Sequence, residues 1–238
     1  MKRPGLSTWG DGFEAVERGM SKWTRKKIRQ AVNRGIRIRE GGRDDVTTFF
    51  ELMLSTCRRQ RTAPVPADKR TMLALWDAAQ AARCIRLTFA EQEGKPVAGL
   101  LSILFGQTAS FWKKGWTSLD GHLHPNELLM QEMLEWSSAR GYRFADFCAV
   151  DRGMAVAMLS GEPLSSEQEG SRHMFNIRFG GRPRLLPEAR VYFPNPGIRL
   201  AYRAIYRKKI RQAGENYQLG RRAAEDHIRR PKSGTKHL

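Results

Sequence analysis

The spacing of apolar residues along the chain changes several times, and each change predicts an element of secondary structure. Three extended runs, rich in aliphatic and aromatic residues, cover residues 84–92, 96–105 and 107–116. Short turns separate these runs, so they are predicted to form neighbouring strands. The middle run is apolar at most positions, which is typical of a central strand covered on both faces. Gly99 within it indicates a bulge or a close backbone approach.

Helical periodicity is found on both sides of this group of strands. The pattern predicts helices over residues 7–19, 22–33, 44–61, 67–83, 125–140 and 198–213. Further strands are predicted over residues 35–39, 142–150 and 184–193. We therefore predict an α/β (α+β) fold, in which a mixed, mostly antiparallel twisted sheet is flanked by helices and followed by a basic C-terminal helix. The predicted segments are a basic helical region at 1–34, a main domain at 35–213 and a charged, partly disordered tail at 214–238.

Positive charge is the strongest compositional signal in the 238 residues. Lysine and arginine total 42 against 24 acidic residues, which gives a formal net charge of +18. Two predicted helices are rich in lysine and arginine. The first carries Lys22, Arg25, Lys26, Lys27 and Arg29, and the second carries Arg203, Arg207 and Lys208. Carboxylates do not offset either run, so we expect an anionic partner such as nucleic acid, anionic lipid or a phosphorylated substrate. The alternative is a solvated surface.

The first basic helix also has a narrow apolar side. Ser21 is its predicted N-cap and Gly35 its stop. Its apolar residues are Trp23, Ile28, Ala31 and Val32. We expect these four to face the core and the cations to face outward.

Several classes of protein are disfavoured by the sequence. No apolar run approaches the roughly 18 residues that a membrane-spanning helix needs, and no apolar stretch follows the first basic residues as in a signal peptide. The three cysteines, Cys57, Cys84 and Cys148, are far apart and have no zinc-binding spacing. We expect reduced thiols in a cytoplasmic protein without a metal.

Four short motifs follow one another in a fixed order. They are SKWTRKKIR at 21–29, Arg61 closing CRRQR, PNELL at 125–129 with ARGY at 139–142 and Asp146-Phe147, and FNIRFGG at 175–181. This order resembles the GNAT (N-acetyltransferase) fold. It resembles more closely the second lobe of the Fem-type aminoacyltransferases and their BioF2-like acetyltransferase relatives, over about residues 12–210. The resemblance implies an acyltransferase of aminoacyltransferase or N-acetyltransferase type.

Two features depart from the family pattern. A lysine that follows the phenylalanine of the last motif is thought to stabilise charge at the reacting carbonyl in the family, and this position is Asn176 here. The resemblance then implies that Asn176 or Arg178 takes that role. The chain also corresponds to one lobe of two, so the acceptor is expected to be small, or a homodimer or partner subunit completes the site.

Amide formation needs an oriented carbonyl, donors for the oxyanion and a base for the attacking amine. The candidate bases are Asp146, Asp151 and His173, and burial among aromatic residues would raise the pKa of Asp146. The alternative for Asp146 is a structural carboxylate paired with an arginine such as Arg143 or Arg152, and the alternative for His173 is a surface or capping histidine. The family obtains its oxyanion donors by splaying two strands, and we expect that splay at Gly99 and residues 100–104.

Candidate substrate-binding residues lie on several predicted elements. They are Arg61, Trp112, Lys113, Asn126 and Phe175. Arg61 and Lys113 are predicted to hold a phosphate or carboxylate of the acceptor. Lys113 and Lys114 follow two aromatic residues, near the end of a core strand. The alternatives are solvated charges for the cations and simple packing for Trp112.

The acyl donor is predicted from the junction that precedes the helix over residues 125–140. CoA-dependent GNAT enzymes usually hold the pyrophosphate on a glycine-rich turn at a helix start. Here that junction reads LDGHLHPN at 119–126, with one glycine, an aspartate and a proline. We therefore predict aminoacyl-tRNA as co-substrate with no other cofactor, and an amine of a small molecule or cell-envelope precursor as acceptor. Alternatives are an acyl-CoA or carrier-protein donor, as in polysaccharide or natural-product biosynthesis, and a non-catalytic nucleic-acid-binding protein.

Overall fold

The computed structural model describes residues 6–8, 13–119, 121–148, 150–185, 192, 194–198, 200–202 and 204. The chain divides into two compact units, Met1–Leu186 and Pro187–Leu238. All strands and helices named below lie in the first unit. The predicted boundaries after residues 34 and 213 stay predictions.

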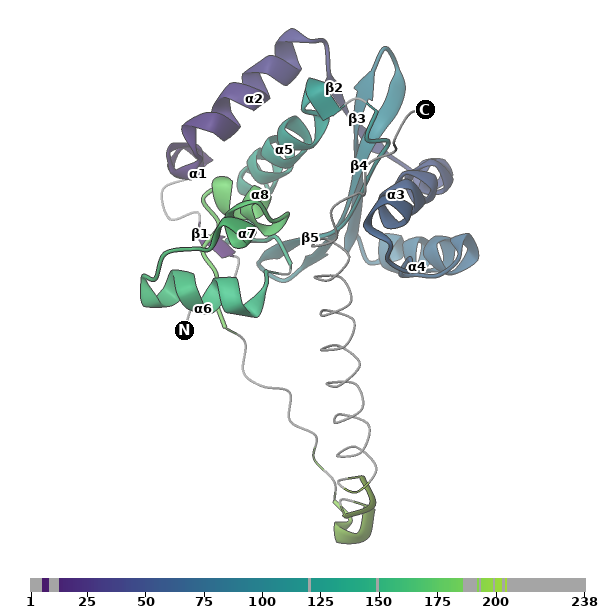
Figure 1. Ribbon diagram of the computed structural model, residues 1–238. Helices are drawn as coiled ribbons and strands as arrows, with labels where there is room; N and C mark the ends of the chain where they lie inside the picture. Colours follow the sequence, from purple (N-terminus) through teal and green to yellow (C-terminus); the bar gives the residue numbers. More distant parts are fainter. Residues whose placement is uncertain are drawn as a thin grey trace, which may run out of the picture. The chain divides into compact units, whose positions relative to one another are not determined.

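A six-stranded sheet forms the centre of the first unit (Figure 1). Its strands are β1 (Leu6–Thr8), β2 (Arg37–Gly41), β3 (Ile85–Gln92), β4 (Lys95–Phe105), β5 (Thr108–Trp116) and β6 (Phe144–Asp146). The order across the sheet is β1-β6-β5-β4-β3-β2. Every neighbouring pair is antiparallel except β5 and β6, which are parallel. The predicted mixed, mostly antiparallel sheet is confirmed.

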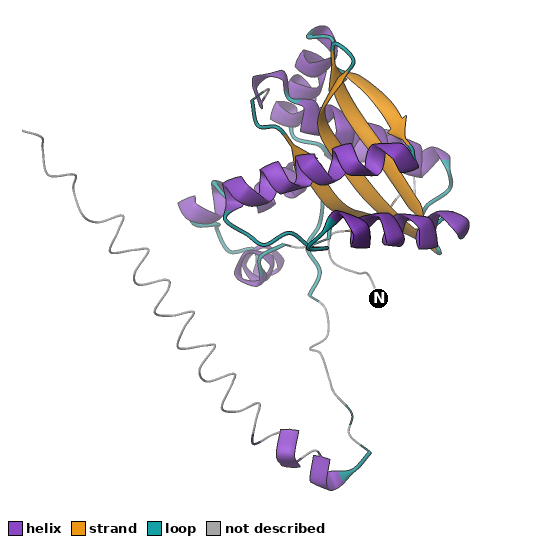
Figure 2. Cartoon of the chain, turned by 90° about the vertical axis from the view of Figure 1, so that its right-hand side faces the viewer, coloured by secondary structure: helices purple, strands orange, loops and turns teal. Residues whose placement is uncertain are grey.

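Helices cover both faces of the sheet (Figures 1 and 2). One face carries α1 (Phe13–Gly19), α2 (Lys22–Asn33) and α5 (Pro125–Ala139), and the other carries α3 (Val46–Gln60) and α4 (Lys69–Ala81). Shorter helices are η1 (Arg43–Asp45), η2 (Gly121–Leu123), α6 (Arg152–Ser160), α7 (Ser166–Glu169) and α8 (His173–Arg178). The sequence pattern missed α6, α7 and α8 because they are too short to show a clear helical period.

The central strand β4 separates two hydrophobic clusters. Leu100 packs in the cluster beneath α5, and Leu101 packs in the cluster beneath α3 and α4. This alternation explains why the run is apolar throughout. Gly99 is required by close packing, because a Cβ there would lie 2.9 Å from Cδ2 of Phe49. The predicted close approach at Gly99 is therefore confirmed.

The buried side of α2 differs from its prediction. Thr24, Ile28 and Ala31 are buried, whereas Trp23 is 44% exposed and Val32 is 51% exposed. The helix turns its polar Thr24 inward because the hydroxyl finds a partner there and donates to the backbone oxygen of Arg178 at 3.2 Å. A buried hydroxyl with a hydrogen bond costs little, so the apolar pattern was right for Ile28 and Ala31 and wrong for Trp23 and Val32.

Two predicted elements at the ends of the first unit also differ. The helix predicted over 7–19 begins only at Phe13, because residues 6–8 form β1 and pair with β6. The strand predicted over 184–193 does not begin by residue 185, and residues 186–191 lie outside the described part of the chain. Most of the helix predicted over 198–213 lies outside it as well.

Candidate active site

The parallel strands β5 and β6 separate after a short paired stretch. They are joined through Thr108 with Phe144, Ala109 with Ala145, and Ser110 with Asp146. β6 then ends, whereas β5 continues to Trp116. Beyond Ser110, the edge of β5 is no longer paired with β6, and the thiol of Cys148 donates to the Phe111 oxygen at 3.3 Å. This divergence is the splay of the sheet.

The splay therefore lies one strand away from its predicted place. Along residues 100–104, β4 pairs with β3 on one side and with β5 on the other. Backbone groups there are used in the ladder, so the prediction at Gly99 and residues 100–104 is wrong. The glycine reflects packing against Phe49 instead.

A register shift in β5 decides which lysine enters the splay. Leu101 pairs with Lys113 and Ser102 pairs with Phe111, so Trp112 is an extra residue in β5. Such a bulge reverses the side of the sheet that later residues face. Lys114 consequently pairs with Leu100 and shares the α5 side of the sheet with it.

Lys114 lies against α8 on that side. Its ammonium is 4.1 Å from the ring centroid of Phe175. The protein atoms around this group exclude water and lower its pKa to about 8, while Glu127 and Cys148 act in the opposite direction. A lysine with such a pKa is mostly charged at pH 7 and sits in a site of low polarity.

A buried carboxylate faces this region from the first turn of α5. The side chain of Glu127 is 10% exposed, and its Oε1 lies 3.6 Å from Nζ of Lys27 and 3.9 Å from Nδ1 of His124. Burial raises the pKa of Glu127, and the nearby cations Lys27 and Lys114 oppose this shift. Lys114 and Glu127 thus have pKa values displaced toward each other by the same desolvation, as in many acid–base sites.

The helices α2 and α8 join two distant sequence motifs at this site. Trp23 lies between two cations, with Nζ of Lys27 at 3.8 Å and the guanidinium of Arg178 at 4.6 Å from its ring centroid. The backbone nitrogen of Ser21 donates to the oxygen of Arg178 at 2.8 Å. The motifs at 21–29 and 175–181 therefore form one surface beside Lys114 and Glu127.

Comparison with protein-family models shows which family this domain belongs to. Residues 18–153, more than half of the chain, match the family model of the acetyltransferase (GNAT) domain. The chain belongs to the GNAT acetyltransferase family. The predicted GNAT-like fold and the prediction of an acyltransferase are both confirmed.

Solved structures similar to this GNAT domain include FemX, at 13% identity and a TM-score of 0.62, covering 74% of this chain and 57% of that chain. The chain thus spans little more than half the length of FemX. The C-terminal domain of a proposed lysylphosphatidylglycerol synthetase from Agrobacterium fabrum matches at 11% identity and a TM-score of 0.45, over 75% of this chain and 59% of that one. An aminoglycoside acetyltransferase from an uncultured soil metagenomic sample matches at 17% identity and a TM-score of 0.41, over 58% and 93%. No curated protein matches the chain.

Two of the three predicted bases of the GNAT domain hold backbone nitrogens of nearby turns. The Asp146 carboxylate accepts from the backbone nitrogen of Cys148 at 2.8 Å. Asp151 caps α6 by accepting from the nitrogen of Met154 at 2.9 Å. His173 begins α8, one turn before Asn176. Asp146 and Asp151 thus each hold a backbone nitrogen, and the roles of all three residues in catalysis stay predictions.

The other predicted catalytic residues lie on α8 close to Lys114. The amide of Asn176 donates to the oxygen of Phe147 at 3.4 Å. Phe175 packs against Phe179, with 5.1 Å between ring centroids. Arg178 turns toward Trp23, as described above. The structure thus brings Phe175, Asn176 and Arg178 to the same region as the lysine of β5.

Of the predicted substrate-binding residues, Arg61, Trp112 and Lys113 lie away from Glu127, whereas Asn126 lies next to it. Arg61 is exposed at the end of α3, where it adopts a left-handed conformation with φ of 52°. Trp112 packs against the cluster beneath α3 and α4, and Lys113 lies 5.1 Å from its ring centroid. Asn126 is half-buried in the first turn of α5, next to Glu127. Of this group, Asn126 lies next to the buried carboxylate.

The predicted tRNA-binding cations divide into two groups. Lys22, Lys26 and Arg29 are exposed on α2. Arg25 instead donates to backbone oxygens at the end of α1, including that of Met20 at 2.9 Å, and Lys27 pairs with Glu127. The second predicted basic surface lies outside the described residues. It consists of Arg203, Arg207 and Lys208.

The sequence analysis missed Lys114 and Glu127 as a pair. Glu127 is part of the PNELL motif, and Lys114 follows Lys113 at the end of a core strand. Lysine and glutamate are both titratable, so the sequence alone could have marked them as candidate catalytic residues. The bulge that orients Lys114 and the burial of Glu127 depend on tertiary structure.

The described residues show neither a metal-binding cluster nor a membrane-spanning helix. Within them, no group of three or more histidine, cysteine, aspartate or glutamate side chains could hold a metal ion. Nor is any described helix long and apolar enough to cross a membrane.

Proposed function

We propose that this GNAT domain transfers an aminoacyl group from aminoacyl-tRNA to an amine of a small molecule or a cell-envelope precursor. The observation that carries the proposal is the start of α5, where CoA-dependent relatives hold a pyrophosphate. Pro125 at the first position has no N–H group, and the Glu127 N–H donates to the His124 oxygen at 3.2 Å. The buried Glu127 carboxylate would also repel a pyrophosphate.

The exposed cations of α2 support the same donor. Lys22, Lys26 and Arg29 lie on a helix whose residue Lys27 contacts Glu127. A polyanion bound along this helix would approach the splay between β5 and β6. Each phosphate that such cations neutralise makes binding more sensitive to salt.

The chemistry assigns one role to each of the two desolvated groups, Lys114 and Glu127. The amine nitrogen attacks the ester carbonyl, a C–N bond forms, and the bond to the ribose oxygen breaks. The Lys114 ammonium stabilises the oxyanion during this step. Glu127 accepts the proton that the attacking amine loses and passes it to the departing ribose oxygen, so the ribose leaves as a hydroxyl and Glu127 returns to its carboxylate form. No covalent enzyme intermediate is needed.

An acyl-CoA or carrier-protein thioester is the second candidate donor. The match to an acetyltransferase domain model favours it, because acetyl transfer commonly uses a thioester. The same pair, Lys114 and Glu127, would serve that reaction equally well. The chain spans little more than half of FemX, so a partner subunit or second copy that completes the acceptor site belongs to both versions of the proposal.

Binding at two salt concentrations distinguishes the donors. The full chain is titrated with total aminoacyl-tRNA and with acetyl-CoA by calorimetry. We expect tRNA binding that weakens steeply with salt and no binding of acetyl-CoA. The opposite pattern, saturable acetyl-CoA binding with weak and unsaturable tRNA binding, contradicts the proposed donor.

Charge-matched variants locate the tRNA surface. The α2 triple variant replaces Lys22, Lys26 and Arg29 with alanine. We expect it to reduce the slope of log affinity against log salt by roughly 2 to 3, since each phosphate contact contributes about 0.7 to 0.9. The control variant replaces three cations of α3 and α4, namely Arg58, Lys69 and Arg70. An equal loss of slope in both variants would place the tRNA elsewhere.

Replacing Glu127 with glutamine tests the assigned base. We expect a loss of about 10²–10⁴-fold in kcat, the usual contribution of a general base. Because burial raises the pKa of Glu127 above its ordinary value, the wild-type rate should fall as pH drops through that raised pKa, and the variant should lose this limb. Asp146→Asn is the comparison, since an amide oxygen can still accept from Cys148. A larger loss in D146N than in E127Q would reverse the assignment.

A further inference from the structure

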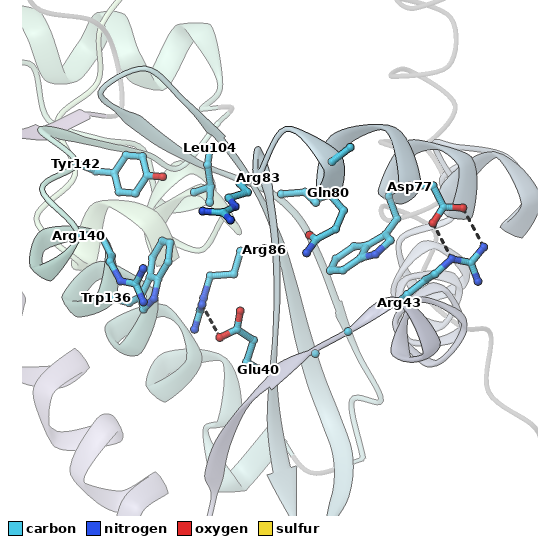
Figure 3. A pocket seen from close by; sticks show the side chains of 15 residues that line it. Glu40, Arg43, Asp77, Gln80, Arg83, Arg86, Leu104, Trp136, Arg140 and Tyr142 are labelled. Carbon is cyan, nitrogen blue, oxygen red and sulfur yellow. Dashed lines mark hydrogen bonds and ion pairs between the residues drawn. The ribbon is translucent and has the colours of Figure 1, made fainter.

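A second cavity lies at the other end of α5 from the Lys114–Glu127 pair. It has a volume of about 600 Å³ and lies where β3 begins and where β4, α4 and α5 end (Figure 3). Trp136, which lines it, follows Glu127 by nine residues of α5, which is about 14 Å along a helix. The proposed transfer reaction therefore makes no use of this cavity.

The lining of the cavity is positively charged. It contains four arginines and two carboxylates: Arg43, Arg83, Arg86, Arg140, Glu40 and Asp77. Two ion pairs, Arg43–Asp77 at 2.6 Å and Arg86–Glu40 at 2.7 Å, account for both carboxylates. Among the described residues, Arg83 and Arg140 have no carboxylate partner. The guanidinium of Arg140 lies 5.4 Å from the ring centroid of Trp136, and two positive charges of the described lining are thus not neutralised by a carboxylate.

Arg86 is the buried member of this group. Its side chain is 12% exposed, and its Nε atom is buried without a hydrogen-bond partner. Figure 3 shows it between Trp136 on one side and Gln80 on the other. Glu40 and Trp136 thus hold this guanidinium in place, and the charges left for a ligand are those of Arg83 and Arg140.

Aromatic rings form one wall of the cavity. The ring of Trp136 stacks on that of Tyr142, with 5.8 Å between centroids and an interplanar angle of 26°. The guanidinium of Arg86 lies 4.2 Å from the centroid of Trp136. Because Tyr142 and Arg86 already lie against Trp136, a planar ligand would pack beside this stack rather than between its members.

We propose that this cavity binds a small phosphate monoester that carries an aromatic ring, such as a mononucleotide. A phosphate monoester has a charge of about −1.5 to −2 at pH 7, which matches the two unpaired arginines. Guanidinium groups bind phosphate oxygens through paired hydrogen bonds. The volume also falls in the range of small-molecule sites, roughly 300–1,000 Å³. The cavity is separated from Glu127 by about 14 Å along α5, so its ligand would bind away from the proposed reaction.

Calorimetry with adenosine 5′-monophosphate tests the proposal on the full chain. Inorganic phosphate and adenosine are titrated alongside, because each supplies one half of the ligand. We expect saturable binding of the nucleotide, with phosphate and adenosine each weaker by about tenfold or more. The double variant Arg83→Gln with Arg140→Gln should weaken nucleotide binding by about tenfold or more, since it removes two charge-assisted contacts. Arg58→Gln with Arg70→Gln is the charge-matched control and should bind like the wild type.

Three results would overturn the proposal. The first is no binding of the nucleotide at millimolar concentration. The second is loss of binding in the α2 triple variant, because the nucleotide would then occupy α2. The third is a double variant at Arg83 and Arg140 that melts at a lower temperature yet binds normally. In that case the two arginines serve only the carboxyl ends of α4 and α5. None of these results depends on the identity of the acyl donor.

Discussion

Replacing Lys114 with methionine is expected to lower kcat by about 10²–10³-fold, the usual cost of removing one group that stabilises an oxyanion. Methionine keeps the length and the apolar stem of the side chain and removes the charge, so packing against Phe175 should persist. The rate to be measured is amide formation with the donor that the binding titrations select. Substrate affinity should change much less than kcat, because the charge acts on the transition state.

The pH dependence separates an electrostatic role of Lys114 from a structural one. The pKa of Lys114 is lowered to about 8, so its positive charge is present below that pH and is lost as pH rises through it. The ratio of the wild-type rate to the K114M rate should therefore be largest near pH 7 and fall above pH 8. Taking the ratio removes the titration of the substrate amine, which is the same in both reactions.

Stability gives an independent check of the same pKa. The folded state holds the Lys114 proton less tightly than the unfolded state, whose lysine titrates near 10.5. Between about pH 8 and 10.5 the unfolded chain binds more protons, so this group makes the protein more stable as pH rises. K114M should lack this contribution, and its free energy of unfolding relative to wild type should fall over that interval.

Two substitutions serve as controls for K114M. Lys113→Met changes the neighbouring residue, which pairs with Leu101, and should leave kcat within about twofold, as expected of a surface charge. Lys114→Arg keeps a charge that does not titrate below pH 12, so the decline above pH 8 should disappear. A larger loss in K113M than in K114M, or a rate ratio that does not change with pH, would refute the role of Lys114.

The order and type of the main elements could be predicted from sequence because they depend on local patterns. The alternation and length of the runs at 84–92, 96–105 and 107–116 correspond to β3, β4 and β5 within one or two residues. The N-cap of α2 could also be predicted from sequence. The Ser21 hydroxyl accepts from the Thr24 nitrogen at 3.1 Å, as an N-cap does. The short pairing of β1 with β6 was not visible, because three residues carry no period.

The candidate site was harder to predict because it depends on register and burial. One extra residue at Trp112 exchanges the sides that Lys113 and Lys114 face, and nothing in the sequence locates that residue. Asp146 and Glu127 are both acidic residues near aromatic ones. Asp146 is satisfied by the Cys148 nitrogen, whereas Glu127 is buried at a helix start. Pattern alone could not distinguish the two environments.

Replacing Gly115 with alanine is expected to cost about 3 kcal/mol or more of the free energy of unfolding, a large share of the 5–15 kcal/mol that stabilises most domains. A Cβ at this position would lie 2.4 Å from the backbone nitrogen of Met53 and 2.6 Å from the backbone carbon of Leu52. These atoms belong to the interior of α3, which cannot yield as the end of a flexible side chain can. β5 and α3 must move apart, so the cluster between them loses packing contacts.

Urea denaturation of G115A and of a matched glycine variant measures this cost. Gly42→Ala is the control, because a Cβ there meets nothing within 4 Å and φ is −111°, and it should change stability by less than about 0.5 kcal/mol. The displacement of β5 should reach the adjacent Lys114, so folded G115A should also show a reduced kcat. If G115A is as stable as G42A, then β5 is not held against α3 as the structure shows. If it is destabilised yet keeps full activity, the placement of Lys114 does not depend on this contact, and the link between the packing of β5 and the candidate site would have to be abandoned.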